Sequence, residues 1–194
     1  RITRLLPAAL LVLVARTIAS APAFDRFRIL GVVKDVAWSS IGLANVHFAG
    51  KPRGYFAAGD QSPVIHFWSL AVEEQFYLVW PLVLVAVALV ARRFSARMPV
   101  RSVLVILAAA SFVACLLWTR AGSAHAFYSL ASRGWELAVG GILALSYRRI
   151  PLNAKGSMVA GALGLVMIGA ATVGFSARTV FPGAAALLPV LGSA

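Results

Sequence analysis

Long apolar runs alternate with short polar or basic breaks along the chain. A helix that crosses a bilayer needs about 20 mostly apolar residues. Runs near that length cover 5–21, 66–91, 102–119, 126–147 and 158–175, and a further run over 180–194 stops before it completes a span. The pattern predicts an all-α fold, a polytopic transmembrane helix bundle. Because both ends look cut, we treat the chain as the middle of a larger protein.

Segment 22–65 is polar in parts and does not read as a simple span. Its stretch 28–46 is apolar enough to enter a membrane, yet it carries Lys34 and Asp35 side by side. If 28–46 does not cross, all the basic breaks fall on one face, which the positive-inside rule makes cytoplasmic. We therefore expect 22–65 to be extracytoplasmic or re-entrant. The basic breaks are Arg1 and Arg4; Arg92, Arg93, Arg97 and Arg101; and Arg148, Arg149 and Lys155.

Composition agrees with a membrane protein. Of 194 residues, 61% are hydrophobic and 12% charged, whereas a soluble domain is usually less than half apolar and about a quarter charged. The net charge of +12 flanks the apolar runs and forms no stripe on a polar domain, which argues against nucleic-acid binding. The single cysteine, Cys115, excludes an intramolecular disulfide and is expected to be a small core residue, and no residue cluster has metal-ligand spacing.

The most informative polar island is 66–81, HFWSLAVEEQFYLVWP, where two adjacent carboxylates enter an apolar run. Carboxylates at bilayer depth cost several kcal/mol unless they are paired, protonated or hydrated. A helix from about Pro63 would place His66, Glu73 and Tyr77 on one face, with the first two about 10.5 Å apart along the axis. Glu74 would lie about 100° round, facing a different helix.

Two further islands hold arginines. Arg133 and Glu136 are three residues apart at the start of an apolar run, and Arg1 and Arg4 precede the first run. The alternatives stay open: the glutamates of 66–81 either line a cavity or pair with an arginine such as Arg133 to lock helices together. Tyr77 is either a cavity or an interfacial aromatic. His47 and His125 are expected to be solvated in loops, and the glycines of 158–175 to serve helix packing.

These islands resemble the motifs of the acyltransferase type 3 family of bacterial membrane O-acyltransferases. Segment 66–81 is similar to the family's hallmark segment, with Phe67 where a threonine is usual. YSLASRGWEL at 128–137 looks like its Arg-x-Trp-Glu-Leu motif, and RITRLLP at 1–7 looks like its Arg-x-x-Arg motif. The resemblance covers essentially the whole chain. It implies about ten membrane helices, of which this chain would hold roughly the third to the eighth, and a catalytic histidine upstream of Arg1.

The resemblance further implies acyl transfer, commonly of acetyl, from cytoplasmic acyl-CoA to a hydroxyl of an extracytoplasmic or membrane-linked glycan, in the bacterial inner membrane. Acyl-CoA would be a co-substrate, with no bound cofactor. The candidate catalytic residues are His66, Glu73 and Glu74; the candidate donor- and substrate-binding residues are Arg1, Arg4, Arg133, Glu136 and Tyr77. The alternatives are a transporter or flippase that uses the buried charges as a substrate or proton path, and a sensor or assembly protein whose polar islands are structural.

Overall fold

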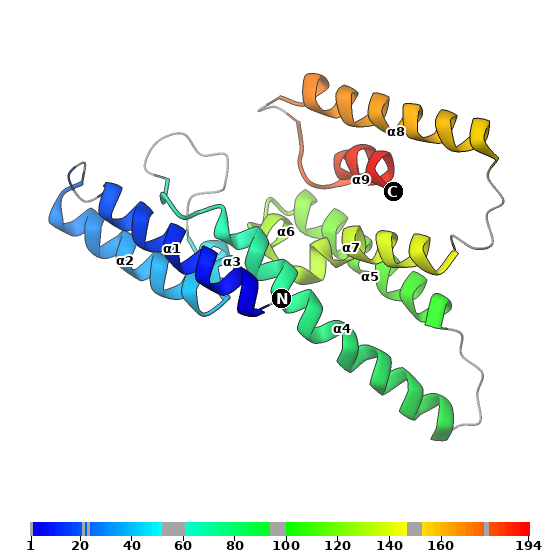
Figure 1. Cartoon of the computed structure of the whole chain (residues 1–194), viewed down its shortest axis with the longest axis horizontal. Coiled ribbons are helices and arrows are strands. Elements are labelled where there is room, and N and C mark those ends of the chain that lie inside the picture. Colours follow the sequence, from blue (N-terminus) through cyan, green and yellow to red (C-terminus); the bar gives the residue numbers. More distant parts are fainter. Residues whose placement is uncertain are drawn as a thin grey trace. The chain divides into compact units, whose positions relative to one another are not determined.

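The computed structural model describes residues 2–20, 22, 24–51, 61–93, 100–146, 153–176 and 179–194. Every regular element in this part of the chain is a helix, which confirms the predicted all-α fold (Figure 1). The chain divides into two compact units, Arg1–Val79 and Trp80–Ala194. Each unit is described by itself.

The first unit is built on a pair of helices, α1 and α2, that pack against each other. Leu13 of α1 and Val32 of α2 are buried there. The carboxylate of Asp25 caps α2 by accepting a hydrogen bond from the Arg28 backbone N–H at 2.9 Å. After α2 the chain turns at Gly42 into α3, which packs back on α2. The unit contains α1 (Ile2–Ser20), α2 (Arg26–Ser40), α3 (Ala44–Ala49) and the first part of α4 (Phe67–Arg93).

The helix that carries the hallmark segment begins later than the sequence predicted. We expected it to start near Pro63, but 63–66 form a tight turn and α4 begins at Phe67. Backbone bonds in this turn join residues three apart, and the Ser62 hydroxyl accepts from the N–H two residues on. Such bonding has about 3.0 residues per turn. The prediction that one helix carries both His66 and Glu73 is therefore wrong.

Three helices are long and apolar enough to cross a membrane, among the residues that the structure describes. They are Phe67–Val90 of α4, α5 (Val100–Arg120) and α8 (Ala154–Gly174). They match the predicted runs 66–91, 102–119 and 158–175. No more than 12% of an apolar 18-residue stretch in each is buried within the protein, so much of their apolar surface is left to face lipid. The chain is a membrane protein.

The predicted run 5–21 forms α1 (Ile2–Ser20) as far as the structure describes it, whereas two other predicted runs are divided into shorter helices. The run 126–147 is split into α6 (His125–Tyr128) and α7 (Leu130–Ser146) by Ser129, whose backbone is extended. The Ser129 hydroxyl accepts from Ala131 N–H at 3.1 Å, and Ser132 donates to the His125 carbonyl at 2.8 Å. These serine hydroxyls bond backbone groups at the break, which is how a helix is interrupted at low cost.

Two more segments are shorter than a span. The 15 residues of α2 cover only about 22 Å, against a hydrocarbon core of about 30 Å. The run 180–194 holds the 3₁₀ turn η3 (Ala184–Ala186) and α9 (Leu187–Ser193). The extracytoplasmic or re-entrant position of 22–65 stays a prediction.

In the second unit α5 and α7 pack closely over a small core. Cys115, Trp135 and Ala186 are its buried members, so the prediction of a core cysteine is confirmed. Phe112 lies edge-on to Trp135 with ring centroids 4.9 Å apart. The hydroxyl of Ser111 on α5 accepts a hydrogen bond from the Trp135 backbone N–H at 3.0 Å, which ties the two helices together.

Helix packing by glycine is confirmed at one position of α8. A methyl group at Gly164 would collide with the backbone carbonyl of Gly192 on α9, so only glycine allows this approach. At Gly161, Gly169 and Gly174 an added methyl group would meet nothing within 4 Å in the described part of the chain. For these three glycines, helix packing stays a prediction.

Candidate active site

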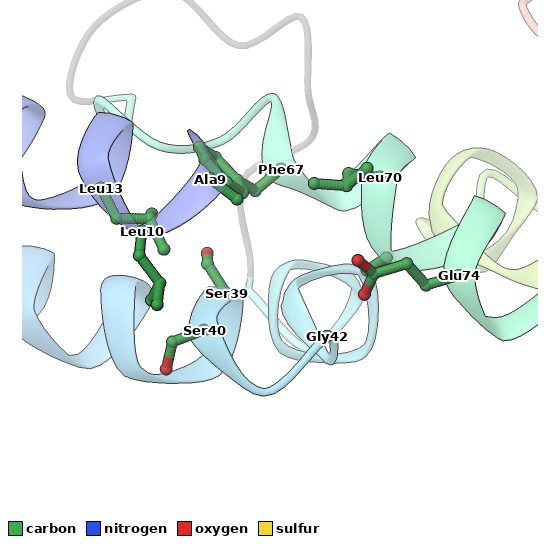
Figure 2. A pocket seen from close by; sticks show the side chains of 10 residues that line it. Ala9, Leu10, Leu13, Ser39, Ser40, Gly42, Phe67, Leu70 and Glu74 are labelled. Atoms are coloured by element: carbon green, nitrogen blue, oxygen red, sulfur yellow. The ribbon is translucent and has the colours of Figure 1, made fainter. Parts of the chain in front are cut away.

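A small pocket lies in the first unit where α1, α2 and α4 come together (Figure 2). Its volume is about 20 Å³, enough for a group the size of one water molecule. Apolar side chains form most of the wall, and two serines and a glutamate supply its polar groups. The lining residues are Ala9, Leu10, Leu13, Ser39, Ser40, Gly42, Phe67, Leu70, Ala71 and Glu74.

Glu74 is the acidic residue of this pocket. Figure 2 shows its carboxylate directed toward the turn at Gly42. A methyl group at Gly42 would lie 3.0 Å from the Glu74 Oε2 atom, and the backbone there is left-handed, with φ of 71°. Glycine is the residue that adopts this φ without steric cost. The carboxylate can therefore approach the turn between α2 and α3, because Gly42 adopts the left-handed conformation and has no side chain.

Helix periodicity explains why Glu74 and not Glu73 lines the pocket. The residues of α4 on the pocket wall are 67, 70, 71 and 74, which follow the i, i+3, i+4, i+7 spacing of one helical face. Glu73 and His66 do not belong to that wall. Of the two glutamates, Glu74 is therefore the one that lines this pocket. An ion pair between either glutamate and an arginine of another helix stays a prediction, and Arg133 pairs with Glu136 within its own unit.

A pair of amides holds α4 against the α2–α3 turn. Asn45 Nδ2 donates to Gln75 Oε1 at 3.1 Å, and Gln75 Nε2 donates to Asn45 Oδ1 at 2.8 Å and to the Gly42 carbonyl at 3.1 Å. Asn45 is buried, at 3% exposure. This pair fixes the position of Glu74 next to it in the sequence. Gln75 belongs to the hallmark segment, but residue type alone did not identify its partner.

His66 lies in the turn that precedes α4, and the residue as a whole is exposed. Neighbouring protein atoms still desolvate part of its imidazole, which lowers the pKa of the ring, and the positive charge of Arg16 lowers that pKa further. Both effects favour the neutral ring near pH 7. A neutral imidazole keeps a lone pair, so His66 can accept a proton or a hydrogen bond.

The structure reveals a second polar cluster that the sequence did not predict. Asp35 of α2 is buried, at 3% exposure, and its Oδ1 atom accepts from His47 Nε2 at 2.8 Å and from Lys51 Nζ. We had expected His47 to be solvated in a loop. It lies instead on α3 and pairs with Asp35. The two residues are 12 positions apart, so their pairing cannot be read from the sequence.

The remaining predicted site residues are not among those that line this pocket. In the second unit, Arg133 donates to Glu136 Oε2 from Nε at 3.2 Å and from Nη2 at 2.8 Å. The guanidinium also lies over the rings of Phe127 and Phe181, 5.4 and 5.9 Å from their centroids. This cluster is a preorganised ion pair with aromatic walls.

Tyr77 is on α4 beyond the pocket wall, with 45% of its surface exposed. Arg1 lies outside the described residues, and for Arg4 the structure describes only the helical backbone of α1. Among the residues that the structure describes, no group of three or more His, Cys, Asp or Glu side chains could hold a metal ion.

No family model and no solved structure matches the chain, but several curated proteins are similar to it. The chain is 34% identical over 163 residues to the "Putative peptidoglycan O-acetyltransferase YrhL" of Bacillus subtilis, covering 80% of this chain and 25% of that protein. It is 33% identical over 153 residues to an uncharacterized protein of Haemophilus influenzae, covering 75% and 60%. A "Putative O-acetyltransferase" of Staphylococcus aureus is 32% identical over 93 residues, covering 48% and 15%.

The chain thus spans a quarter of the length of the first of these relatives and less than two thirds of the second. The names of two of the three describe O-acetyl transfer. This agrees with the three motifs at 1–7, 66–81 and 128–137. The chain is therefore related to bacterial proteins that are named as O-acetyltransferases.

Proposed function

We propose that this chain is part of a multi-pass enzyme of the bacterial inner membrane that transfers an acyl group, commonly acetyl, from cytoplasmic acyl-CoA to a hydroxyl of an extracytoplasmic or membrane-linked glycan. The relatives named for O-acetyl transfer support the reaction class. The pocket beside Glu74 supports the site at which a hydroxyl group arrives. The apolar α4, α5 and α8 support a membrane setting.

The polar groups of the pocket carry the proposal because they suit a hydrogen-bond donor. Glu74, as a carboxylate, accepts hydrogen bonds. The Ser39 hydroxyl already donates to the Asp35 carbonyl at 2.7 Å, and that of Ser40 to the Ala37 carbonyl at 2.8 Å. The hydroxyl oxygens of both serines can therefore accept a hydrogen bond from a bound hydroxyl group. A hydroxyl is the size of the water molecule that about 20 Å³ admits, whereas a sugar ring would have to stay outside.

Acyl transfer to a hydroxyl forms a carbon–oxygen bond and breaks the carbon–sulfur bond of the thioester. The hydroxyl proton must reach a base, and the developing oxyanion needs hydrogen-bond donors. In this proposal Glu74 orients the hydroxyl, and the neutral imidazole of His66 is available at the same end of α4. Arg1 and Arg4 bind phosphates of the donor, as guanidinium groups do in bidentate fashion. Tyr77 and the pair Arg133–Glu136 belong to the substrate path.

The test uses the full-length protein in membranes, with labelled acetyl-CoA and a glycan acceptor. We expect Glu74→Gln to lower transfer roughly a hundredfold, because the hydroxyl loses its orienting carboxylate. Glu73→Gln is the matched comparison, since it removes the adjacent carboxylate that does not line the pocket. A smaller loss in Glu73→Gln assigns the effect to the pocket. If the wild-type protein moves a solute without consuming thioester, the chain is a transporter and the proposal fails.

A further inference from the structure

The buried acid of the first unit is Asp35, which lies on α2 and holds two basic side chains. His47 Nε2 and Lys51 Nζ both approach its Oδ1 atom, at 2.8 and 2.5 Å. The side chains of the acid and the histidine are only 4% and 12% exposed. The lysine is 38% exposed. The pocket beside Glu74 does not include any of these three residues.

The hydrogen bonds fix which nitrogen of His47 carries the proton. A carboxylate paired with an ammonium group only accepts hydrogen bonds. The Nε2 atom next to Asp35 must therefore be the protonated one in the neutral ring, and Nδ1 keeps its lone pair. Within the part of the chain that the structure describes, Nδ1 has no hydrogen-bond partner. An oriented imidazole with one nitrogen on a carboxylate and the other available is the arrangement of a general base.

Aromatic rings hold the imidazole in this orientation. Trp38 stacks on it with an interplanar angle of 4° and ring centroids 5.5 Å apart, and Phe48 lies against it at 52°. Trp38 and Asp35 are three residues apart on α2, so one helical face presents both the stacking surface and the acid. The ring is thus fixed by two independent contacts from the same helix.

The hydrogen-bonded pair of Asp35 and His47, here called the dyad, is built on α2 and α3, and α2 also lines the pocket. Ser39, on the pocket wall, is one turn from Asp35 on α2, about 6 Å along the axis, and its hydroxyl donates to the Asp35 carbonyl. On α3, Asn45 lies two residues before His47 and bonds to Gln75, the neighbour of Glu74. The dyad and the pocket therefore share their supporting helices and their hydrogen-bonded frame.

We propose that His47 accepts the proton of the acceptor hydroxyl, with Asp35 as its positioning residue. This rests on the proposed acyl transfer. The hydroxyl oxygen bonds to the acyl carbon, the carbon–sulfur bond breaks, and the proton passes to His47 Nδ1 and then to the thiolate that leaves. The chain then contains a base of its own, in addition to the histidine that the family resemblance places upstream of Arg1.

The experiment measures acetyl transfer by the full-length protein carrying His47→Ala, with imidazoles of graded basicity added. We expect a loss of at least a hundredfold and a recovered rate that rises with the basicity of the imidazole. If His47 only fills space, every added imidazole of similar size should restore acetyl transfer to the same extent. Rescue that does not depend on basicity overturns the proposal, as does wild-type turnover in the variant.

Two further variants keep the test decisive. His47→Gln retains an amide donor to Asp35, and we expect it to fold and to be as inactive as His47→Ala. Loss of folding in His47→Gln overturns the proposal, because it assigns the histidine a structural role. His125→Gln is the control: that histidine also lies against a tryptophan, Trp118, at 5.8 Å, and has no carboxylate partner among the described residues. If the wild-type protein consumes no thioester, the acyl-transfer proposal itself has failed, which is a different result from activity in His47→Ala.

Discussion

Gly42→Ala tests the close approach of the Glu74 carboxylate to the α2–α3 turn. The backbone at Gly42 has φ of 71°, and a residue with a Cβ atom loses roughly 1–2 kcal/mol in this left-handed region. The new methyl group would also lie 3.0 Å from Glu74 Oε2, which forces the carboxylate to shift by a few tenths of an ångström. We expect both lower stability and weaker orientation of the hydroxyl that Glu74 holds.

Gly122→Ala separates these two effects. Gly122 has φ of 63°, nearly the same backbone strain, but an added methyl group there meets nothing within 4 Å among the described residues. Both variants should lose about 1–2 kcal/mol of unfolding free energy, measured by tryptophan fluorescence of the purified full-length protein in denaturant. Only Gly42→Ala should lower acetyl transfer further, by about tenfold, which corresponds to about 1.4 kcal/mol in the barrier.

The orienting role of the Glu74 carboxylate fails if Gly42→Ala transfers acetyl at the wild-type rate, or if Gly122→Ala loses as much activity. The first result would show that the Glu74 carboxylate need not stay where the pocket places it. The second would show that the loss follows from general destabilisation. Equal stability of Gly42→Ala and wild type would contradict the left-handed turn itself.

Three further predictions concern packing and charge. Gln75→Leu should cost about 1–3 kcal/mol of unfolding free energy, because it leaves the buried Asn45 amide without this partner. In a double-mutant cycle with Asn45→Leu, the double variant should be more stable than the sum of the two single losses implies. Arg16→Gln should raise the pKa of His66 toward its ordinary value, since a positive charge that disfavours the imidazolium is removed; an NMR titration that shows a fall would contradict this. Ser111→Ala should cost about 1 kcal/mol, measured by denaturant unfolding, because a backbone N–H of α7 loses its acceptor.

Much of the helical architecture was predictable because a span is a local property. A run of about 20 apolar residues must satisfy its backbone within itself in a membrane, and the runs at 66–91, 102–119 and 158–175 became long helices. The break at Ser129 was not predictable from apolar length, since it depends on whether serine hydroxyls bond backbone groups nearby. The start of α4 moved by four residues because 63–66 adopt tighter hydrogen bonding than an α-helix.

The residue types of the pocket were predictable, but the helix faces that form it were not. The sequence identified Glu73 and Glu74 as expensive carboxylates in one segment, but which of them lines a pocket depends on where α1 and α2 pack against α4. Asp35 and His47 are 12 residues apart, with a helix end and a turn between them. A pairing of this kind needs the direction of the turn at Gly42, and residue spacing does not contain that information.

The residue pattern was enough to identify an all-α membrane protein with charged residues in apolar surroundings, and the three motifs predicted the acyltransferase relatives. These properties follow from composition and from contacts within one helix, where positions three and four apart are neighbours whatever the rest of the chain does. The tertiary structure alone decided that Glu74 lines the pocket, that Gln75 joins Asn45, and that a buried acid orients His47. The reason is that these contacts join separate helices, so they exist only once the turns have set how those helices pack.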